Sequence, residues 1–186
     1  MDIFEKCYQR YIQDEVREQG VYPYFRALES RQDTEVIMEG KRRIMLGSNN
    51  YLGLTTNSSV IEAGVQAYRT LGSGCSGSRF LNGTLKLHLE LEEELARFLH
   101  KDAVMTFSTG FQSNLGIISA IVGPKDYVIM DRENHASLYD GCRLSFGQML
   151  RFRHSDMADL EKKLQKVPEG CGCLIVTDGV FSMGGD

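Results

Sequence analysis

The chain has 186 residues, an apolar fraction of 42%, a charged fraction of 25% and a formal net charge of −4. This composition is that of a globular protein, and the length suits one domain or part of a larger one. The acidic balance without a basic run excludes the usual pattern of nucleic-acid binding. No apolar stretch approaches the roughly 20 residues that a membrane span needs, so no transmembrane segment is predicted.

Five cysteines are scattered along the chain, at positions 7, 75, 142, 171 and 173. An odd count with irregular spacing argues against a disulfide framework and indicates a reducing compartment. The charged, amphipathic N-terminus is not a secretory signal, so we expect a cytoplasmic protein. The pair Cys171-Gly-Cys173 lacks a second ligand pair, and no metal site is predicted.

Residues 1–45 are predicted to form an N-terminal helix and a hairpin, and residues 46–186 the first part of a larger domain. Apolar residues at three- and four-residue spacing predict a helix over 1–18, which Gly20 ends. Two short apolar runs, 35–38 and 41–46, flank Glu39-Gly40 and predict a hairpin. Helices are expected over 59–71 and 85–99. Thr84 is the predicted cap of the second, and His88 within it is expected to be structural.

Two loops combine polar residues with glycine. The first, GSNNYLGL at 47–54, suits either a ligand-binding loop or a turn closed by Asx hydrogen bonds. The second, GSGCSGSRFLNG at 72–83, has four glycines in twelve residues. Because ordering so much glycine costs entropy, this loop is predicted to be either mobile or held by a ligand or a neighbouring subunit.

The stretch TFSTGFQSN at 106–114 is central to the prediction. An apolar run at 103–107 predicts a short buried strand, and a helical pattern continues to Val122. Ser108 and Thr109 can cap that helix, and Gly110 lets the backbone approach a ligand closely. A helix N-terminus offers free N–H groups and a partial positive charge. The pattern therefore fits either a phosphate cradle or a capped helix without a ligand.

After this stretch, strands alternate with helices. Strands are predicted at 127–130, 149–152 and 173–177, and helices at 136–145 and 157–167. This alternation predicts an α/β fold with a mainly parallel sheet, which binds ligands at the carboxyl ends of its strands. Polar clusters at 108–110, 131–137 and 178–186 fall at such ends. His135 stands one residue before a predicted helix at one of them, a position that favours a functional role.

Five motifs in order resemble the α-oxoamine synthases, pyridoxal-phosphate enzymes of fold type I: SNNYLGL, GSGCSGSRFLNGTLKLHLELEEELA, FSTGFQSNLG, NHASLYDGCRLS and TDGVFSMGGD. The resemblance runs from about residue 22 to residue 186. It implies the N-terminal part of the aminotransferase-like large domain of that fold type. SRFLNGTLKLHLELE and YPYFR are most similar to the bacterial members that condense L-serine with palmitoyl-CoA to give 3-oxosphinganine.

The resemblance implies roles for residues at the cofactor. Gly110 and Phe111 would offer backbone N–H groups to the phosphate of pyridoxal 5′-phosphate, and Ser108 and Thr109 would add hydroxyl bonds. His135 would lie face to face on the pyridine ring and contact the substrate carboxylate.

The remaining implied roles concern the end of the chain and the two glycine-containing loops. Ser182 would hydrogen-bond the cofactor, and Asp178 would support it. Asn49, Asn50 and Tyr51 would lie near the amino acid substrate. The loop 72–83, with Ser78 assigned to substrate binding, would lie near a homodimer interface and the acyl-CoA channel.

The family's chemistry also needs a lysine in a Ser/Thr-x-x-Lys setting and an acidic residue in an Asp-Asp-Ala-His stretch. In the family both follow the point that matches Asp186, and neither occurs here. We therefore expect the N-terminal half of an enzyme about twice as long, inactive by itself. The alternatives are the family members that make 8-amino-7-oxononanoate or 2-amino-3-oxobutyrate, a non-catalytic fragment or binding module, and a generic phosphate-binding α/β domain outside the family.

Overall fold

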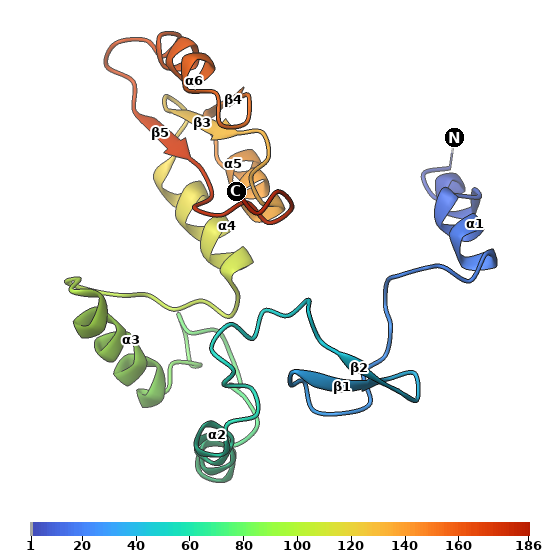
Figure 1. Ribbon diagram of the computed structural model, residues 1–186. Helices are drawn as coiled ribbons and strands as arrows, with labels where there is room; N and C mark the ends of the chain where they lie inside the picture. Colours follow the sequence, from blue (N-terminus) through green and yellow to red (C-terminus); the bar gives the residue numbers. More distant parts are fainter. Residues whose placement is uncertain (1) are drawn as a thin grey trace. The chain divides into compact units, whose positions relative to one another are not determined.

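The computed structural model describes residues 2–186. The chain divides into two compact units, one ending at Gly83 and one from Thr84 to Asp186 (Figure 1). The domain boundary at residue 45 stays a prediction. Among residues 2–186, every helix is too short or too polar to cross a membrane.

The first unit contains the 3-10 helix η1 (Glu5–Tyr8), helices α1 (Ile12–Glu18) and α2 (Ser58–Leu71), and strands β1 (Glu35–Met38) and β2 (Lys41–Ile44). The prediction of one helix over 1–18 is wrong. Gln9 is extended, with ψ 148°, and separates η1 from α1. The helix starts again because the Asp14 carboxylate accepts a hydrogen bond from the Tyr11 N–H at 2.9 Å, which caps the new N-terminus. Gly20 follows α1 with φ +70°, as predicted.

The hairpin prediction is confirmed. β1 and β2 pair antiparallel, with Met38 opposite Lys41 across a two-residue turn. Glu39 and Gly40 both have positive φ, 51° and 69°. A two-residue turn of this kind matches the right-handed twist of the strands that it joins.

The second unit contains helices α3 (Lys86–Leu99), α4 (Gly110–Ile121), α5 (Ala136–Leu144) and α6 (Met157–Leu164), and strands β3 (Tyr127–Asp131), β4 (Gln148–Phe152) and β5 (Cys173–Val176). The three strands form one parallel sheet in the order β4-β3-β5. The predicted alternation and the parallel sheet are therefore confirmed.

Two local predictions in this unit are wrong. Residues 103–107 form no strand, and Met105 is 74% exposed. A strand requires a partner strand, which an apolar run alone does not supply. Thr84 is not the cap of α3, because the N-cap position is Leu85. The Leu85 N–H donates to His88 Nδ1 at 2.9 Å, so His88 has the structural role that was expected.

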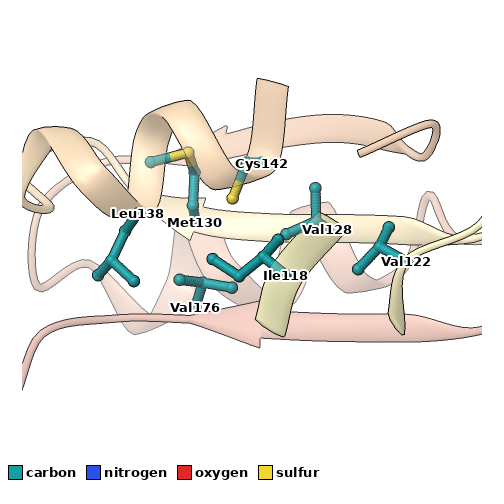
Figure 2. Packing of buried hydrophobic residues seen from close by; sticks show 7 residues of the cluster. All are labelled: Ile118, Val122, Val128, Met130, Leu138, Cys142 and Val176. Carbon is teal, nitrogen blue, oxygen red and sulfur yellow. The ribbon is translucent and has the colours of Figure 1, made fainter. Parts of the chain in front are cut away.

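The core of the second unit lies between the sheet and the pair α4 and α5. Val128 and Met130, at alternate positions of β3, pack with Ile118, Val122, Leu138, Cys142 and Val176 (Figure 2). The intervening Ile129 is also fully buried, on the other face of the strand. Burial on both faces explains the continuous apolar sequence of β3. The resulting rigid sheet fixes the carboxyl ends of β3 and β5, where the polar clusters lie.

Candidate cofactor site

The N-terminus of α4 forms one wall of the candidate site. Thr109 is its N-cap, and the Thr109 hydroxyl accepts a hydrogen bond from the Gln112 N–H at 3.1 Å. The first i→i−4 bond runs from the Ser113 N–H to the Thr109 carbonyl. The N–H groups of Gly110 and Phe111 precede that bond and have no acceptor inside the helix. A Cβ atom added to Gly110 would meet nothing within 4 Å, so the space beside its Cα is open, and free N–H groups at a helix N-terminus suit an anion.

The N-terminus of α5 forms the second wall. His135 is the N-cap residue, and its Nδ1 accepts a hydrogen bond from the Ser137 N–H at 3.2 Å. The same Nδ1 lies 2.7 Å from the Ser137 hydroxyl oxygen. These contacts fix the orientation of the imidazole and leave Nε2 for an external partner. The rings of His135 and Phe111 meet edge to face with 6.4 Å between their centroids. The two helix N-termini therefore converge on one point.

The end of β5 is joined to the segment that contains His135. The Asn134 side chain donates to the Val176 carbonyl at 2.9 Å and accepts from the Asp178 N–H at 3.1 Å. The Asp178 carboxylate accepts from the His135 N–H at 2.7 Å. Asp178 therefore fixes the backbone of His135, and its negative charge lies at the positive end of α5. Its predicted role in supporting a cofactor stays a prediction.

A close approach of α4 and α5 holds the two walls together. The Asn114 amide donates to the hydroxyl of the buried Ser137 at 2.9 Å. At Gly141 an added Cβ would lie 2.9 Å from the Asn114 carbonyl and 3.0 Å from Ile118 Cδ1. Only glycine allows this separation of the helices.

The turn after β5 carries Ser182, which is exposed. The Phe181 N–H donates to the Asp186 carbonyl at 3.0 Å, and the Gly185 N–H donates to the Phe181 carbonyl at 2.8 Å. Phe181 is only 8% exposed and anchors the turn. Ser182 is thus the residue next to a buried anchor, on the segment that continues from Asp178. Its contact with a cofactor stays a prediction.

The predicted substrate residues lie in the first unit. Asn49, Asn50 and Tyr51 occupy the loop between β2 and α2. The Asn50 N–H donates to the Ser48 hydroxyl at 3.0 Å, so the loop is closed by local polar bonds, and Tyr51 is 86% exposed.

The other predicted substrate residue, Ser78, lies in the glycine-rich loop. Its carbonyl accepts hydrogen bonds from the N–H groups of Leu81, Asn82 and Gly83. A Cβ at Gly83 would lie 1.9 Å from the Gly77 carbonyl oxygen, which belongs to the backbone, so this tight turn requires glycine. Substrate binding by both loops stays a prediction.

Sequence reasoning missed the residues that support the site: Asn114, Asn134, Ser137 and Gly141. One signal was available, because Asn114 directly precedes the apolar part of the helix that begins at Leu115, and polar residues in such a place are usually hydrogen-bonded when buried. The contacts of Asn134 join residues 42 and 44 positions apart, and local sequence does not reveal them.

A second polar cluster at the same edge of the sheet was also missed. His154, which follows β4, lies between the carboxylates of Asp131 and Asp186 at 3.0 Å and 2.8 Å. Its ring packs edge-on against Phe181, with 4.4 Å between the centroids.

Comparison with known proteins identifies relatives of similar sequence. The serine palmitoyltransferase of Sphingobacterium spiritivorum is 53% identical over 175 residues, which are 94% of this chain and 44% of that protein. The serine palmitoyltransferase of Bacteroides thetaiotaomicron is 58% identical over 168 residues, 90% of this chain and 43% of that protein. The 8-amino-7-oxononanoate synthase of Geobacter sulfurreducens is 46% identical over 172 residues, 92% of this chain and 44% of that protein.

Solved structures agree with these relatives. A serine palmitoyltransferase variant from S. paucimobilis with a bound PLP–myriocin aldimine matches with a TM-score of 0.93 and 39% identity, over 100% of this chain and 48% of that one. A serine palmitoyltransferase structure with PLP as internal aldimine matches with a TM-score of 0.92, 39% identity and the same coverage. The chain therefore spans less than half the length of these relatives.

The predicted fold type is thus confirmed, and the family profile described as aminotransferase class I and II matches residues 41–186. With that match over most of its length, the chain belongs to the aminotransferase class I and II family.

Proposed function

We propose that this chain provides the phosphate-binding and ring-binding part of a pyridoxal-phosphate-dependent serine palmitoyltransferase. The reaction joins L-serine to palmitoyl-CoA with loss of CO2 and gives 3-oxosphinganine. The observation that carries the proposal is the convergence of the α4 and α5 N-termini, with 6.4 Å between the ring centroids of Phe111 and His135. The relatives named serine palmitoyltransferase, at 53% and 58% identity, support the choice of reaction.

The described residues fit pyridoxal phosphate. A phosphate dianion is stabilised by the free N–H groups of Gly110 and Phe111 and by the positive end of α4. The open space beside Gly110 lets the phosphate approach the backbone. Because Ser137 holds its ring nitrogen, His135 presents a flat surface of fixed orientation, as an aromatic cofactor ring requires. The neighbouring Thr109, at the cap, and Ser108 add hydroxyl groups to the same wall.

Bound pyridoxal phosphate supplies an electron sink for negative charge at the substrate Cα. The residues of this chain orient the participants. His135 Nε2 would donate to the substrate carboxylate, since Nδ1 accepts from the Ser137 N–H. Asp178 fixes the His135 backbone, and Ser182 would hydrogen-bond the cofactor. We assign transfer of the Cα proton to a lysine in the part of the relatives beyond the position of Asp186.

The other proposed components follow from the same resemblance. The amino acid would bind near Asn49, Asn50 and Tyr51, and the acyl-CoA near Ser78 in the glycine-rich loop. We further propose a homodimer located in the cytoplasm. The 8-amino-7-oxononanoate synthase reaction is the second candidate, supported by the Geobacter sulfurreducens relative at 46% identity.

The test uses the protein expressed from its complete coding sequence. L-Serine, glycine and alanine are each supplied with palmitoyl-CoA and shorter acyl-CoAs, and products are identified by mass spectrometry. We expect 3-oxosphinganine from serine and palmitoyl-CoA. Turnover of alanine with a short acyl-CoA in its place would favour the second candidate. Absence of a bound-cofactor absorbance band would contradict both.

The variant His135→Asn tests the role of the imidazole separately from helix capping. Asparagine is a good N-cap residue, so the stability of α5 should be preserved while the ring surface is lost. We expect weaker cofactor binding and a large loss of turnover. The matched control is His100→Asn, because His100 is exposed with φ +53°, a conformation that asparagine tolerates. Equal activity of the two variants would refute the assignment.

A further inference from the structure

A polar cluster at the carboxyl edge of the sheet ties the end of β3 to the turn that carries Ser182. Its members are Asp131 at the end of β3, His154 after β4, and Asp186 after the turn. His154 Nδ1 lies 3.0 Å from one Asp131 carboxylate oxygen, and His154 Nε2 lies 2.8 Å from one of Asp186. None of these three residues belongs to the two walls of the candidate cofactor site, the N-termini of α4 and α5.

Asp131 is a fixed anchor. Its side chain is almost completely buried, and it also accepts hydrogen bonds from the Glu133 N–H at 2.9 Å and the Ser155 N–H at 3.0 Å. A buried carboxylate is stable when such donors surround it. Ser155 has φ +52°, which is unusual for a residue with a side chain, and the bond to Asp131 accompanies this conformation.

His154 connects this anchor to the turn in two ways. With a carboxylate at each ring nitrogen, both nitrogens act as donors in the charged imidazolium form. The second connection is a ring contact: the rings of His154 and Phe181 pack edge to face, at 79° with 4.4 Å between their centroids. Phe181 and Asp186 are the two ends of the turn, joined by the Phe181 N–H bond to the Asp186 carbonyl.

We propose that His154 is a positioning residue for Ser182. By holding both ends of the turn to Asp131, it keeps the backbone of Ser182 at the sheet edge next to Asp178, with the hydroxyl directed to the cofactor. This inference rests on the proposed function for the contact between Ser182 and pyridoxal phosphate. We call the contacts of His154 with Asp131, Asp186 and Phe181 the clamp, and all of them lie within this chain.

The test removes the outer half of the clamp and leaves the anchor intact. In the protein expressed from its complete coding sequence, Asp186→Ala deletes one acceptor of His154 and preserves the bond to Asp131. His154→Phe deletes both bonds but keeps a ring against Phe181. The matched control is Glu133→Gln, which removes one exposed negative charge beside the cluster. Asp186→Asn, which retains an oxygen acceptor, is the rescue variant.

Amide hydrogen exchange without cofactor reports the clamp directly. We expect faster exchange at Phe181 and Gly185 in Asp186→Ala and His154→Phe, by about tenfold to a hundredfold, as one hydrogen bond to a charged group implies. Glu133→Gln should match the parent protein, and Asp186→Asn should lie between. Unchanged exchange in both clamp variants would overturn the inference.

Cofactor binding then reports whether the clamp acts through Ser182. The dissociation constant for pyridoxal phosphate should rise in Asp186→Ala and in Ser182→Ala, and the double variant should be no worse than the poorer single one. Additive losses would show that His154 does not act through Ser182. A parent protein without affinity for pyridoxal phosphate would overturn the proposed function as well, whereas weaker binding by Ser182→Ala together with normal binding by Asp186→Ala would overturn only this inference.

Discussion

The substitution Gly141→Ala tests the close approach of α4 and α5, the two helices whose N-termini form the candidate site. Two effects oppose each other. In a helix interior, alanine is favoured over glycine by about 1 kcal/mol. Against this, the new Cβ would lie 2.9 Å from the Asn114 carbonyl oxygen, where ordinary contacts begin at 3.4 Å. The shortfall of 0.5 Å cannot be relieved by a side-chain rotation, because the Asn114 carbonyl belongs to the backbone of α4.

The size of the effect follows from these two terms. Overfilling a packed contact typically costs about 1–3 kcal/mol. After subtraction of the helix preference, Gly141→Ala should lower the free energy of unfolding by about 0–2 kcal/mol. The matched control is Gly64→Ala in α2, where an added Cβ meets nothing within 4 Å. That substitution should instead be neutral or stabilising by up to about 1 kcal/mol.

The assay is urea unfolding of the protein expressed from its complete coding sequence, followed by circular dichroism and extrapolated linearly to water. The quantity to compare is the difference between the two variants, because the helix preference cancels and about 1–3 kcal/mol of packing strain remains. Gly141→Ala should also weaken binding of pyridoxal phosphate, since α4 and α5 must move apart. Equal stabilisation by both substitutions would refute the reasoning.

Three further predictions concern the polar groups and the chain by itself. Asp178→Ala should weaken cofactor binding about threefold to tenfold, because the His135 N–H loses its acceptor. Asp178→Asn keeps an oxygen acceptor and should lose less affinity. Equal losses of affinity in titrations with pyridoxal phosphate would contradict a hydrogen-bonding role. Hydrogen bonding to Asp186 and Asp131 raises the pKa of His154 above its ordinary value, and the bond from His154 lowers the pKa of Asp186. The stabilisation that the charged His154 contributes is therefore fully present below about pH 6.5, and it is lost as the pH rises through the raised pKa of His154. The contribution of Asp186 is lost only at acid pH, as the pH falls below the ordinary aspartate range and through the lowered pKa of Asp186. An NMR titration should give His154 a pKa above that of a free histidine, which Asp186→Asn brings down, and a pKa at or below the ordinary value in the parent protein would count against the clamp. Finally, the purified 186-residue chain, mixed with pyridoxal phosphate and borohydride, should show no stoichiometric adduct by mass spectrometry, because none of its lysines lies in a Ser/Thr-x-x-Lys setting; a serine-responsive adduct on one lysine would reverse that expectation.

The parts of the fold that sequence predicted well depend on neighbouring residues. The cap at Thr109 and the turn at Glu39-Gly40 are local, because the side chain or backbone conformation that defines each lies within three residues. The alternation of strands and helices after residue 126 is similarly visible in apolar spacing. The run at 103–107 has the same apolar character, but strand formation depends on a distant partner that spacing does not identify.

The candidate site shows the same limit. Gly110 and His135 could be selected from position alone, since one begins a helix and the other follows a strand. The residues that support them could not be selected in this way, because their hydrogen bonds join distant positions. Asn114 bonds to Ser137, 23 positions away, and His154 bonds to Asp186, 32 positions away. Such pairs depend on how the helices pack and on the order of the strands in the sheet, and neither can be read from local sequence.

The side-chain bridge from Asn134 to the end of β5 has a consequence for the order in which the protein assembles during synthesis. The cradle at the start of α4 uses bonds within a few residues, so it can form as soon as that helix leaves the ribosome. The bond between the His135 N–H and Asp178 spans 43 positions. At translation rates of about 5–20 residues per second, Asp178 is added about 2–9 s after His135. Until then His135 lacks the backbone anchor that Asp178 provides, whereas the cap of α4 already has both of its bonding partners.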